Sequence, residues 1–165
     1  MLSSEPLDIP DDYRGPITVA HELSGDDVSW AYPAASSAPD PTVSVYGAGP
    51  EPIDEHEPLS GFLIQLALFE TITTMAPYRA GARQLPAAAA ARITGSLNQV
   101  PLRPLRWPHD PTSFYVGPGI IAMVTAADGG YPQADGTVSV HVGCRDRAVL
   151  RPLVDAGVEW DVLDY

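Results

Sequence analysis

Alternating hydrophobic and polar positions mark the first part of the chain. Residues 17–21 and 28–32 both alternate, and the turn-forming residues 24–27 lie between them. This pattern predicts a β-hairpin, because successive side chains of a strand point to opposite faces. A third strand is expected over residues 42–46. Residues 47–58 contain three prolines and four acids, and they are expected to form a loop.

The most hydrophobic segment, residues 59–76, predicts a long helix that is followed by Pro77. Six of its large apolar residues recur at steps of three and four and share one face: Leu59, Phe62, Leu63, Leu66, Phe69 and Ile72. Ile64, Leu68 and Met75 extend the apolar character around most of the circumference. A helix that is apolar nearly all round is expected to be buried, so this one is predicted to be the central helix of the core.

The second half of the chain returns to strands and short helices. A helix is expected over residues 86–94, where an alanine run follows Pro86 and Gly95 ends it. Strands are expected at 113–116, 120–126, 137–142 and 158–162, with a helix at 147–156 and a proline-rich loop at 99–112.

These elements predict an α+β fold of the antiparallel type. A mostly antiparallel sheet is expected to pack against the long buried helix, at about 59–76, and one or two shorter helices on one face. Residues 1–16 carry three prolines and predict an extended lead-in. Residues 17–165 are then expected to form a single domain, which is an ordinary domain length.

Acidic residues dominate the charge. The chain has 21 acids, nine basic residues that are all arginine, and a net charge of −12. Residues 1–57 hold 12 acids and one arginine, a balance of −11; the balances of 58–127 and 128–165 are +3 and −4. Such a chain is not expected to bind nucleic acid or an anionic membrane, since both need cationic side chains. A basic protein partner suits this charge.

The single cysteine, Cys144, excludes an intrachain disulfide. The first residues lack the basic and apolar regions of a signal peptide, and the apolar run 62–69 is too short to span a bilayer. A cytoplasmic protein is therefore expected.

No catalytic, metal-binding or cofactor-binding motif is recognised. The four histidines (His21, His56, His109 and His141) lack metal-ligand spacing, and residues 54–57 are interpreted as a solvated acidic turn. Cys144 is interpreted as a buried, unreactive thiol, and Glu70 as an exposed residue or a member of an ion pair. Arg103, Arg106 and Trp107 form a basic and aromatic cluster, for which a bridge to the acidic N-terminal third is expected.

The segment Glu57-Pro58-Leu59-Ser60-Gly61-Phe62-Leu63-Ile64-Gln65-Leu66-Ala67-Leu68-Phe69-Glu70 resembles a helix of bacterial proteins of the SUKH superfamily, which are related to the yeast cell-wall assembly regulator. The stretches 28–31, 40–43, 106–108 and 112–115 are similar to further parts of that family. Only about 16 residues precede the first predicted strand, at residue 17, so the chain resembles a member shortened at its N-terminus. The resemblance implies an α+β fold without catalysis and a role as an immunity protein that binds and neutralises a toxin.

The leading hypothesis is therefore a non-catalytic protein-binding module that neutralises a basic toxin or regulates a partner protein. A structural or assembly component that forms a homo-oligomer is the first alternative, and an enzyme with an unrecognised site is the second. The expected partner contacts are the acidic and aromatic residues of the first third of the chain: Asp26, Asp27, Trp30, Tyr32, Tyr46, Asp54, Glu55 and Glu57.

Overall fold

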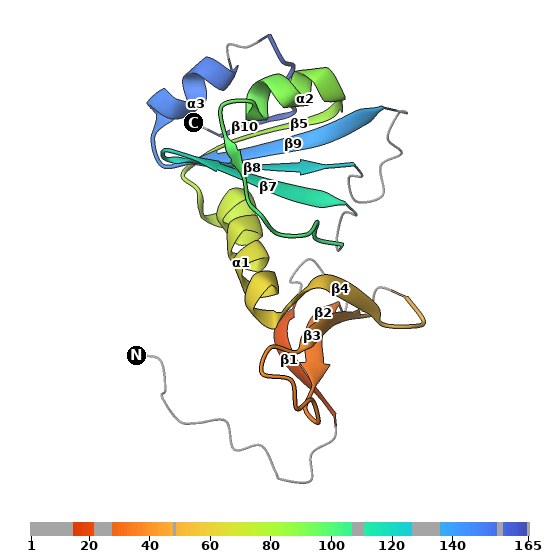
Figure 1. The fold of residues 1–165 in the computed structure, drawn as a ribbon. Helices are drawn as coiled ribbons and strands as arrows, with labels where there is room; N and C mark the ends of the chain where they lie inside the picture. Colours follow the sequence, from red (N-terminus) through yellow and green to blue (C-terminus); the bar gives the residue numbers. More distant parts are fainter. Residues whose placement is uncertain are drawn as a thin grey trace. The chain divides into compact units, whose positions relative to one another are not determined.

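The computed structural model describes residues 15–21, 28–47, 49–106, 111–126, 136–154 and 157–164. The chain divides into two compact units, Met1–Asp54 and Glu55–Tyr165, and each is described by itself. The α+β class is confirmed, with antiparallel sheets and helices (Figure 1). Most of the expected lead-in lies outside the described residues, and the single domain over 17–165 stays a prediction.

The first unit contains the short strands β1, β2 and β3, and the chain passes into the second unit within β4, the last strand of the order β1-β2-β3-β4. The predicted hairpin is confirmed: β1 (Pro16–His21) pairs antiparallel with β2 (Ser29–Pro33), which pairs in turn with β3 (Thr42–Tyr46). Trp30 lies directly opposite Val45, and both side chains are buried. The alternation of the sequence thus places a small apolar core on this sheet.

The prediction of a loop over residues 47–58 is wrong for the second half of this range, because β4 occupies Ile53–Pro58. Its alternating positions hold Glu55 and Glu57 rather than apolar residues. Glu55 is nevertheless buried, and its carboxylate accepts a hydrogen bond from the backbone of Arg106. A strand whose inward positions are carboxylates satisfied by hydrogen bonds has the composition of a loop, so the sequence pattern missed it.

The long helix is confirmed as α1 (Leu59–Glu70), which continues into a π-helical turn, η1 (Thr71–Met75). The wider turn is closed by a hydrogen bond of 2.8 Å from the Ala76 N–H to the Thr71 carbonyl. The hydroxyls of Thr71 and Thr73 donate to the carbonyls of Ala67 and Phe69, four residues earlier, at 2.6 and 2.9 Å. Such bonds from a threonine hydroxyl to the carbonyl four residues earlier satisfy the hydroxyl within the helix.

The sequence predicted that this helix is buried nearly all round, but the structure shows one buried side and one exposed side. Phe62, Gln65 and Ile72 are buried on one side, whereas Leu63, Ile64 and Met75 on the other side are exposed. The helix is therefore a core element on one side only, and its other side is an apolar surface.

The second unit contains a six-stranded antiparallel sheet in the order β10-β5-β9-β8-β7-β6. Three of the expected strands are confirmed as β7 (Thr112–Gly117), β8 (Ile120–Thr125) and β9 (Thr137–Cys144). The short β6 (Asn98–Gln99) forms one edge, and β10 (Val162–Asp164), which starts four residues later than expected, forms the other.

The sequence pattern missed β5 (Tyr78–Pro86), which pairs with β9 near the middle of this sheet. Its central residues are Ala80, Gly81 and Ala82, which lack the β-branched and aromatic side chains typical of strands. Ala80 and Ala82 belong to the core, where α2 (Ala87–Thr94) and α3 (Arg147–Val154) pack close to the strand. On the other face, a Cβ atom at Gly81 would lie 3.0 Å from the His141 ring. Packing at a covered strand here outweighs intrinsic strand propensity.

Helical elements contact both faces of the sheet rather than the single face expected: α2 and α3 pack on one face, and the π-helical turn η1 packs on the other, with α1 extending away from the sheet (Figure 1). Val140, Val142 and Cys144 of β9 share the main core with residues of α2 and α3. Gly143 points to the opposite face, where a Cβ atom would lie 2.9 Å from the Cβ of Ala76 and 3.2 Å from the Cα of Ile72. The absence of a side chain at Gly143 therefore lets η1 sit directly on the sheet.

The helix at 147–154 begins as the sequence predicted. The Asp146 carboxylate accepts a hydrogen bond of 2.8 Å from the Ala148 N–H, which is the N-terminal capping contact expected of aspartate. Across the described parts of the chain, no helix has both the length and the apolar character needed to cross a membrane.

Candidate protein-docking surface

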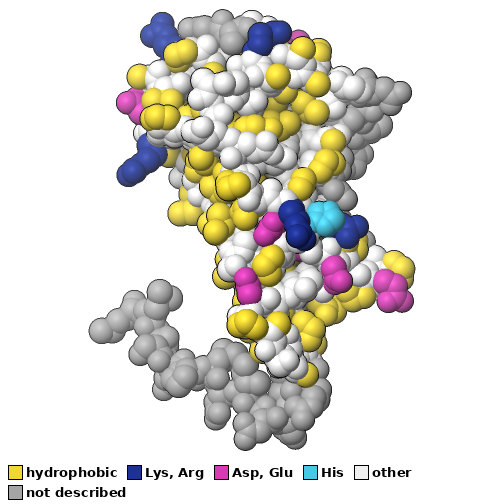
Figure 2. Space-filling view, viewed as in Figure 1, with side chains coloured by type: hydrophobic (Ala, Val, Ile, Leu, Met, Phe, Trp, Pro, Cys, Tyr) yellow, Lys and Arg dark blue, Asp and Glu magenta, His cyan; other side chains and the backbone are white. Residues whose placement is uncertain are grey.

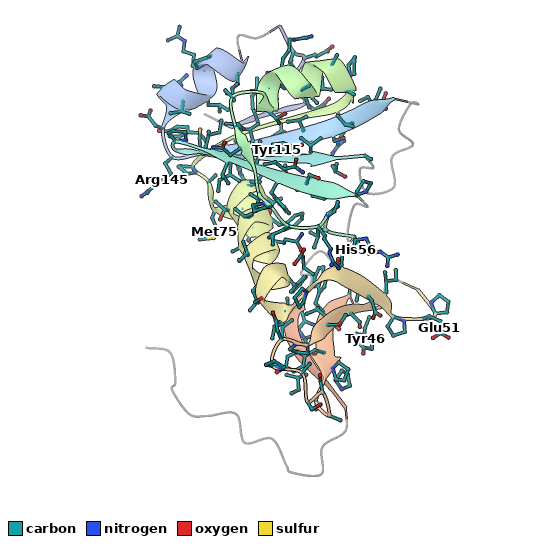
Figure 3. The ribbon with its side chains drawn as sticks, in the orientation of Figure 1. Tyr46, Glu51, His56, Met75, Tyr115 and Arg145 are labelled. Carbon is teal, nitrogen blue, oxygen red and sulfur yellow. The ribbon has the colours of Figure 1, made fainter. Side chains whose placement is uncertain are left out.

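One side of α1 and η1 is an exposed apolar surface of the second unit. We call it the α1 surface, and define it by five residues: Leu63, Ile64, Ala67, Leu68 and Met75. Leu63, Ile64 and Met75 are 45%, 52% and 72% exposed, Ala67 is also exposed and Leu68 is half-buried. Figure 2 shows hydrophobic side chains gathered over this helix, and Figure 3 shows Met75 projecting sideways from its end.

Helical geometry makes these residues one continuous surface. Leu63 and Ala67 are separated by four positions, as are Ile64 and Leu68, so each pair lies one turn apart on the same side. Met75 follows Leu68 by seven positions and extends the surface into η1. Contiguous exposed apolar side chains of this kind mark contact sites, whereas single exposed ones are ordinary.

The opposite side of the helix is fixed by buried residues. Gln65 is almost completely buried, and its Nε2 donates a hydrogen bond of 2.6 Å to the carbonyl of Arg103. Phe62 and Ile72 are buried on the same side, and Ile72 belongs to the turn that rests at Gly143. Because one side is anchored in this way, the helix presents the α1 surface outward in a fixed rotation about its axis.

A pair of carboxylates holds the segment 103–106 beside this helix. Glu57 Oε1 accepts a hydrogen bond of 2.7 Å from the Arg103 N–H, and Glu55 Oε2 accepts one of 2.9 Å from the Arg106 N–H. The guanidinium of Arg103 donates to the His56 carbonyl at 3.1 Å. The expected bridge between the arginine cluster and the acidic N-terminal third is therefore present, through backbone amides and one guanidinium.

Two of the residues expected to contact a partner, Glu55 and Glu57, take part in this bridge. The carboxylates of Glu55 and Glu57 already accept hydrogen bonds within the fold, and Glu55 is only 4% exposed. Two residues of the helix resemblance, Glu57 and Gln65, therefore hold the backbone of Arg103. These two polar positions of the segment therefore have contacts within the fold, although the buried Oε1 of Gln65 has no hydrogen-bond partner.

The remaining expected contacts belong to the first unit. Trp30 is 6% exposed and lies in the core, while Tyr32 and Tyr46 are half-buried. Asp54 is exposed, and its Oδ1 accepts a hydrogen bond of 2.6 Å from the Ser44 hydroxyl. Tyr46 and Glu51 are labelled in Figure 3. Asp26 and Asp27 lie outside the described residues.

The α1 surface was not predicted as a site, although the sequence contains a signal for it. Ile64, Leu68 and Met75 are the apolar residues that did not fit the main face of the predicted helix. Apolar residues beyond the width of one buried face indicate either complete burial or a second, exposed contact face. Only packing distinguishes these two cases.

The histidines and Glu70, which were considered as catalytic or metal-binding groups, have different settings in the structure. Glu70, His21 and His56 are exposed, and His109 lies outside the described residues. His141 lines a small hollow of about 230 Å³ with Arg79, whose guanidinium is hydrogen-bonded to the carbonyl of Thr73. Within the described ranges, no three histidine, cysteine or carboxylate side chains form a metal-binding group.

Cys144 is buried, and burial raises the pKa of its thiol, with the nearby Asp146 carboxylate acting in the same direction. Its thiol lies 3.3 Å from the carbonyl of Asp146 and donates a hydrogen bond to it. A thiol with a raised pKa is a weak nucleophile, because only the thiolate attacks. The interpretation of Cys144 as an unreactive core residue is therefore supported by its setting.

This raised pKa predicts a loss of stability at alkaline pH. Above the ordinary cysteine pKa of about 8.5, the unfolded chain releases the thiol proton before the folded chain does. The free energy of unfolding should therefore fall as pH rises from about 8.5 toward the folded-state pKa. Urea titrations between pH 7 and 10 should show a steeper decline for the natural chain than for Cys144→Ala. Equal slopes would contradict this effect of burial.

No protein-family model, curated protein or solved structure matches this chain, so its relationship to the proteins that it resembles rests on the residues quoted above.

Proposed function

We propose that this chain is a non-catalytic protein-binding module of the immunity type that the SUKH resemblance implies. In this proposal it acts in the cytoplasm, where it binds and neutralises a basic toxin or regulates a basic partner protein. The α1 surface is its contact site. The single observation that carries the proposal is the exposure of large apolar side chains along one side of an otherwise anchored helix.

The exposure of these side chains supports binding for an energetic reason. Burying a large aliphatic side chain contributes about 1.5–3 kcal/mol, and Leu63, Ile64 and Met75 are each exposed by more than two fifths. A partner that covers them gains much of this free energy. The helix loses little conformational freedom on binding, because its other side is already fixed by Phe62, Gln65 and Ile72.

Charge supports a basic partner. The chain carries −12 in total, and residues 59–75 contain one carboxylate, Glu70, and no arginine. A negative field speeds encounter with a cationic protein and repels an anionic one. Glu70, which is exposed on α1, is the acid that carries this role in the proposal.

The test is a comparison of partners recovered with tagged natural chain and with an Ile64→Glu variant. Ile64 is 52% exposed, so the variant should fold while a charge interrupts the α1 surface. We expect a stoichiometric basic protein with the natural chain and at least about tenfold less with the variant, equivalent to about 1.4 kcal/mol. Ala91→Glu, an exposed alanine of α2, adds the same charge and should leave recovery unchanged.

If the natural chain, Ile64→Glu and Ala91→Glu all recover the same amount of the basic partner, the α1 surface is not the contact site. Recovery of the chain's own copies alone would instead favour the assembly alternative.

A separate observation favours that alternative, in which the chain forms a homo-oligomer. β10 is an edge strand of the six-stranded sheet, and its residues Val162 and Leu163 are 46% and 42% exposed. An edge strand offers backbone groups to which another strand can add. Sedimentation analysis over a hundredfold range of concentration should show a monomer if the binding proposal is correct, and a concentration-dependent dimer if the alternative is.

A further inference from the structure

We propose that the α1 surface receives an amphipathic helix whose flanks are basic, so that a helical segment of the partner lies along α1 and η1. This inference rests on the proposed function and deepens it by naming the chemistry of the bound segment.

The shape of the surface favours a helix. α1 and η1 run from Leu59 to Met75, and at about 1.5 Å per residue this is a rod of about 25 Å. The backbone hydrogen bonds of a helix are made internally, so a partner strand could not add to it as to a sheet edge. Contact must be made through side chains, and a second helix presents an apolar stripe of matching length and periodicity.

The hydrogen bonding of η1 lets this surface be covered at low cost. The Thr71 hydroxyl donates to the Ala67 carbonyl at 2.6 Å, so one of the polar groups between Leu68 and Met75 already has a partner. The Thr73 hydroxyl donates to the Phe69 carbonyl at 2.9 Å. Burying a hydroxyl that keeps its hydrogen bond avoids the penalty of an unsatisfied polar group. A partner can therefore cover Thr71 and Thr73 of the π-helical turn, on the way to Met75, without leaving their hydroxyls unsatisfied.

Charge selects the flanks of the bound helix. Glu70 is exposed at the edge of the α1 surface, and it is the one charged residue between Leu59 and Met75. A lysine or arginine on the partner's flank could pair with it while the apolar stripe stays in contact. A second copy of this chain would bring two molecules of charge −12 together and place Glu70 against an apolar stripe, so the observations favour a basic partner over self-association.

Fluorescence anisotropy with three synthetic peptides tests this inference on the full chain. The first peptide, of about 18 residues to match the rod, is a helix with leucine and alanine on one face and arginine on the other. The second replaces every arginine with glutamate. The third has the composition of the first in an order that leaves no apolar face. We expect the first to bind at least about tenfold more tightly than the other two, a difference of about 1.4 kcal/mol.

Ile64→Glu separates apolar contact from charge. The variant is more acidic, so charge alone predicts tighter binding of the arginine peptide, whereas the α1 surface predicts binding weaker by about tenfold or more. Glu70→Gln should weaken binding by about two- to fivefold, as expected for an exposed ion pair. Ala91→Glu, away from the helix, should not weaken it.

Several results would overturn the inference. If the arginine peptide and its reordered version bind equally, charge alone attracts them and an apolar face is not required. If the glutamate peptide binds as tightly as the arginine peptide, basic flanks are not required. Dimerisation of the natural chain that Ile64→Glu abolishes would assign the surface to a second copy. If no peptide binds while Ile64→Glu still loses the native partner, the inference fails and the proposed function stands. If Ile64→Glu also keeps the native partner, both fail.

Discussion

Replacing Gly143 with alanine is expected to lower the free energy of unfolding by about 1–3 kcal/mol, the usual cost of an extra carbon in a closely packed site. The new Cβ would lie 2.9 Å from the Cβ of Ala76 and 3.2 Å from the Cα of Ile72. Neither contact can be relieved by turning a flexible side chain, because one partner is a methyl group fixed to the backbone and the other is backbone. The π-helical turn must therefore move away from β9. Urea denaturation followed by circular dichroism measures the loss.

Gly49→Ala is the matched control for this substitution. A Cβ atom at Gly49 meets nothing within 4 Å, so the same change in composition should alter the free energy of unfolding by no more than about 0.5 kcal/mol. If Gly143→Ala were as stable as Gly49→Ala, the close seating of η1 on the sheet would be incorrect. The fixed orientation of the α1 surface would then lose its physical basis.

Glu55→Ala is expected to lower the free energy of unfolding by about 1.5–3 kcal/mol, the range for hydrogen bonds to charged groups. Glu55 is 4% exposed, and its carboxylate accepts the Arg106 N–H at 2.9 Å. Alanine removes this acceptor and leaves the amide without it in a buried setting. The segment 103–106 should loosen, and faster amide hydrogen exchange at Arg106 would report this directly.

Two comparison variants locate the cause of that effect. Glu55→Gln keeps an oxygen that can accept the Arg106 N–H, so it should retain more stability than alanine. Glu51→Ala removes an exposed acid and should change the free energy of unfolding by no more than about 0.5 kcal/mol. If Glu55→Ala were no less stable than Glu51→Ala, the carboxylate would have no part in holding the segment.

Local patterns predicted much of the fold because they act over a few residues. The alternation at residues 28–32, the alanine run after Pro86 and the capping position of Asp146 each correspond to an element that the structure contains. Each signal depends on the backbone of its own segment, through strand pleat, helix propensity or a cap. The fold class followed from their order along the chain.

Elements that depend on distant partners were missed. β4 has buried Glu55 where an apolar residue would be expected, and its partner in hydrogen bonding is 51 residues away at Arg106. β5 has Ala80 and Gly81 because neighbouring elements pack closely on it, which its own sequence does not reveal. Tertiary packing overrides intrinsic strand propensity at both sites.

The candidate site was the least predictable feature for a related reason. The sequence revealed that residues 59–76 are apolar nearly all round, but it could not reveal which side would be covered. Coverage depends on Gly143, Gln65 and the segment 103–106, which are held against only one side of the helix. Glu55 and Glu57, which the sequence indicated as partner contacts, accept hydrogen bonds from the backbone of this segment.

The most direct test of the α1 surface as a contact site is site-specific photo-crosslinking in native cells. A photoreactive phenylalanine analogue would replace Ile64 on α1 in one variant, and Ala88, an exposed residue of α2, in the other. The account predicts that position 64 crosslinks to one basic protein in high yield and that position 88 does not. Equal crosslinking from both positions, or crosslinking from position 64 only to copies of this chain, would contradict it.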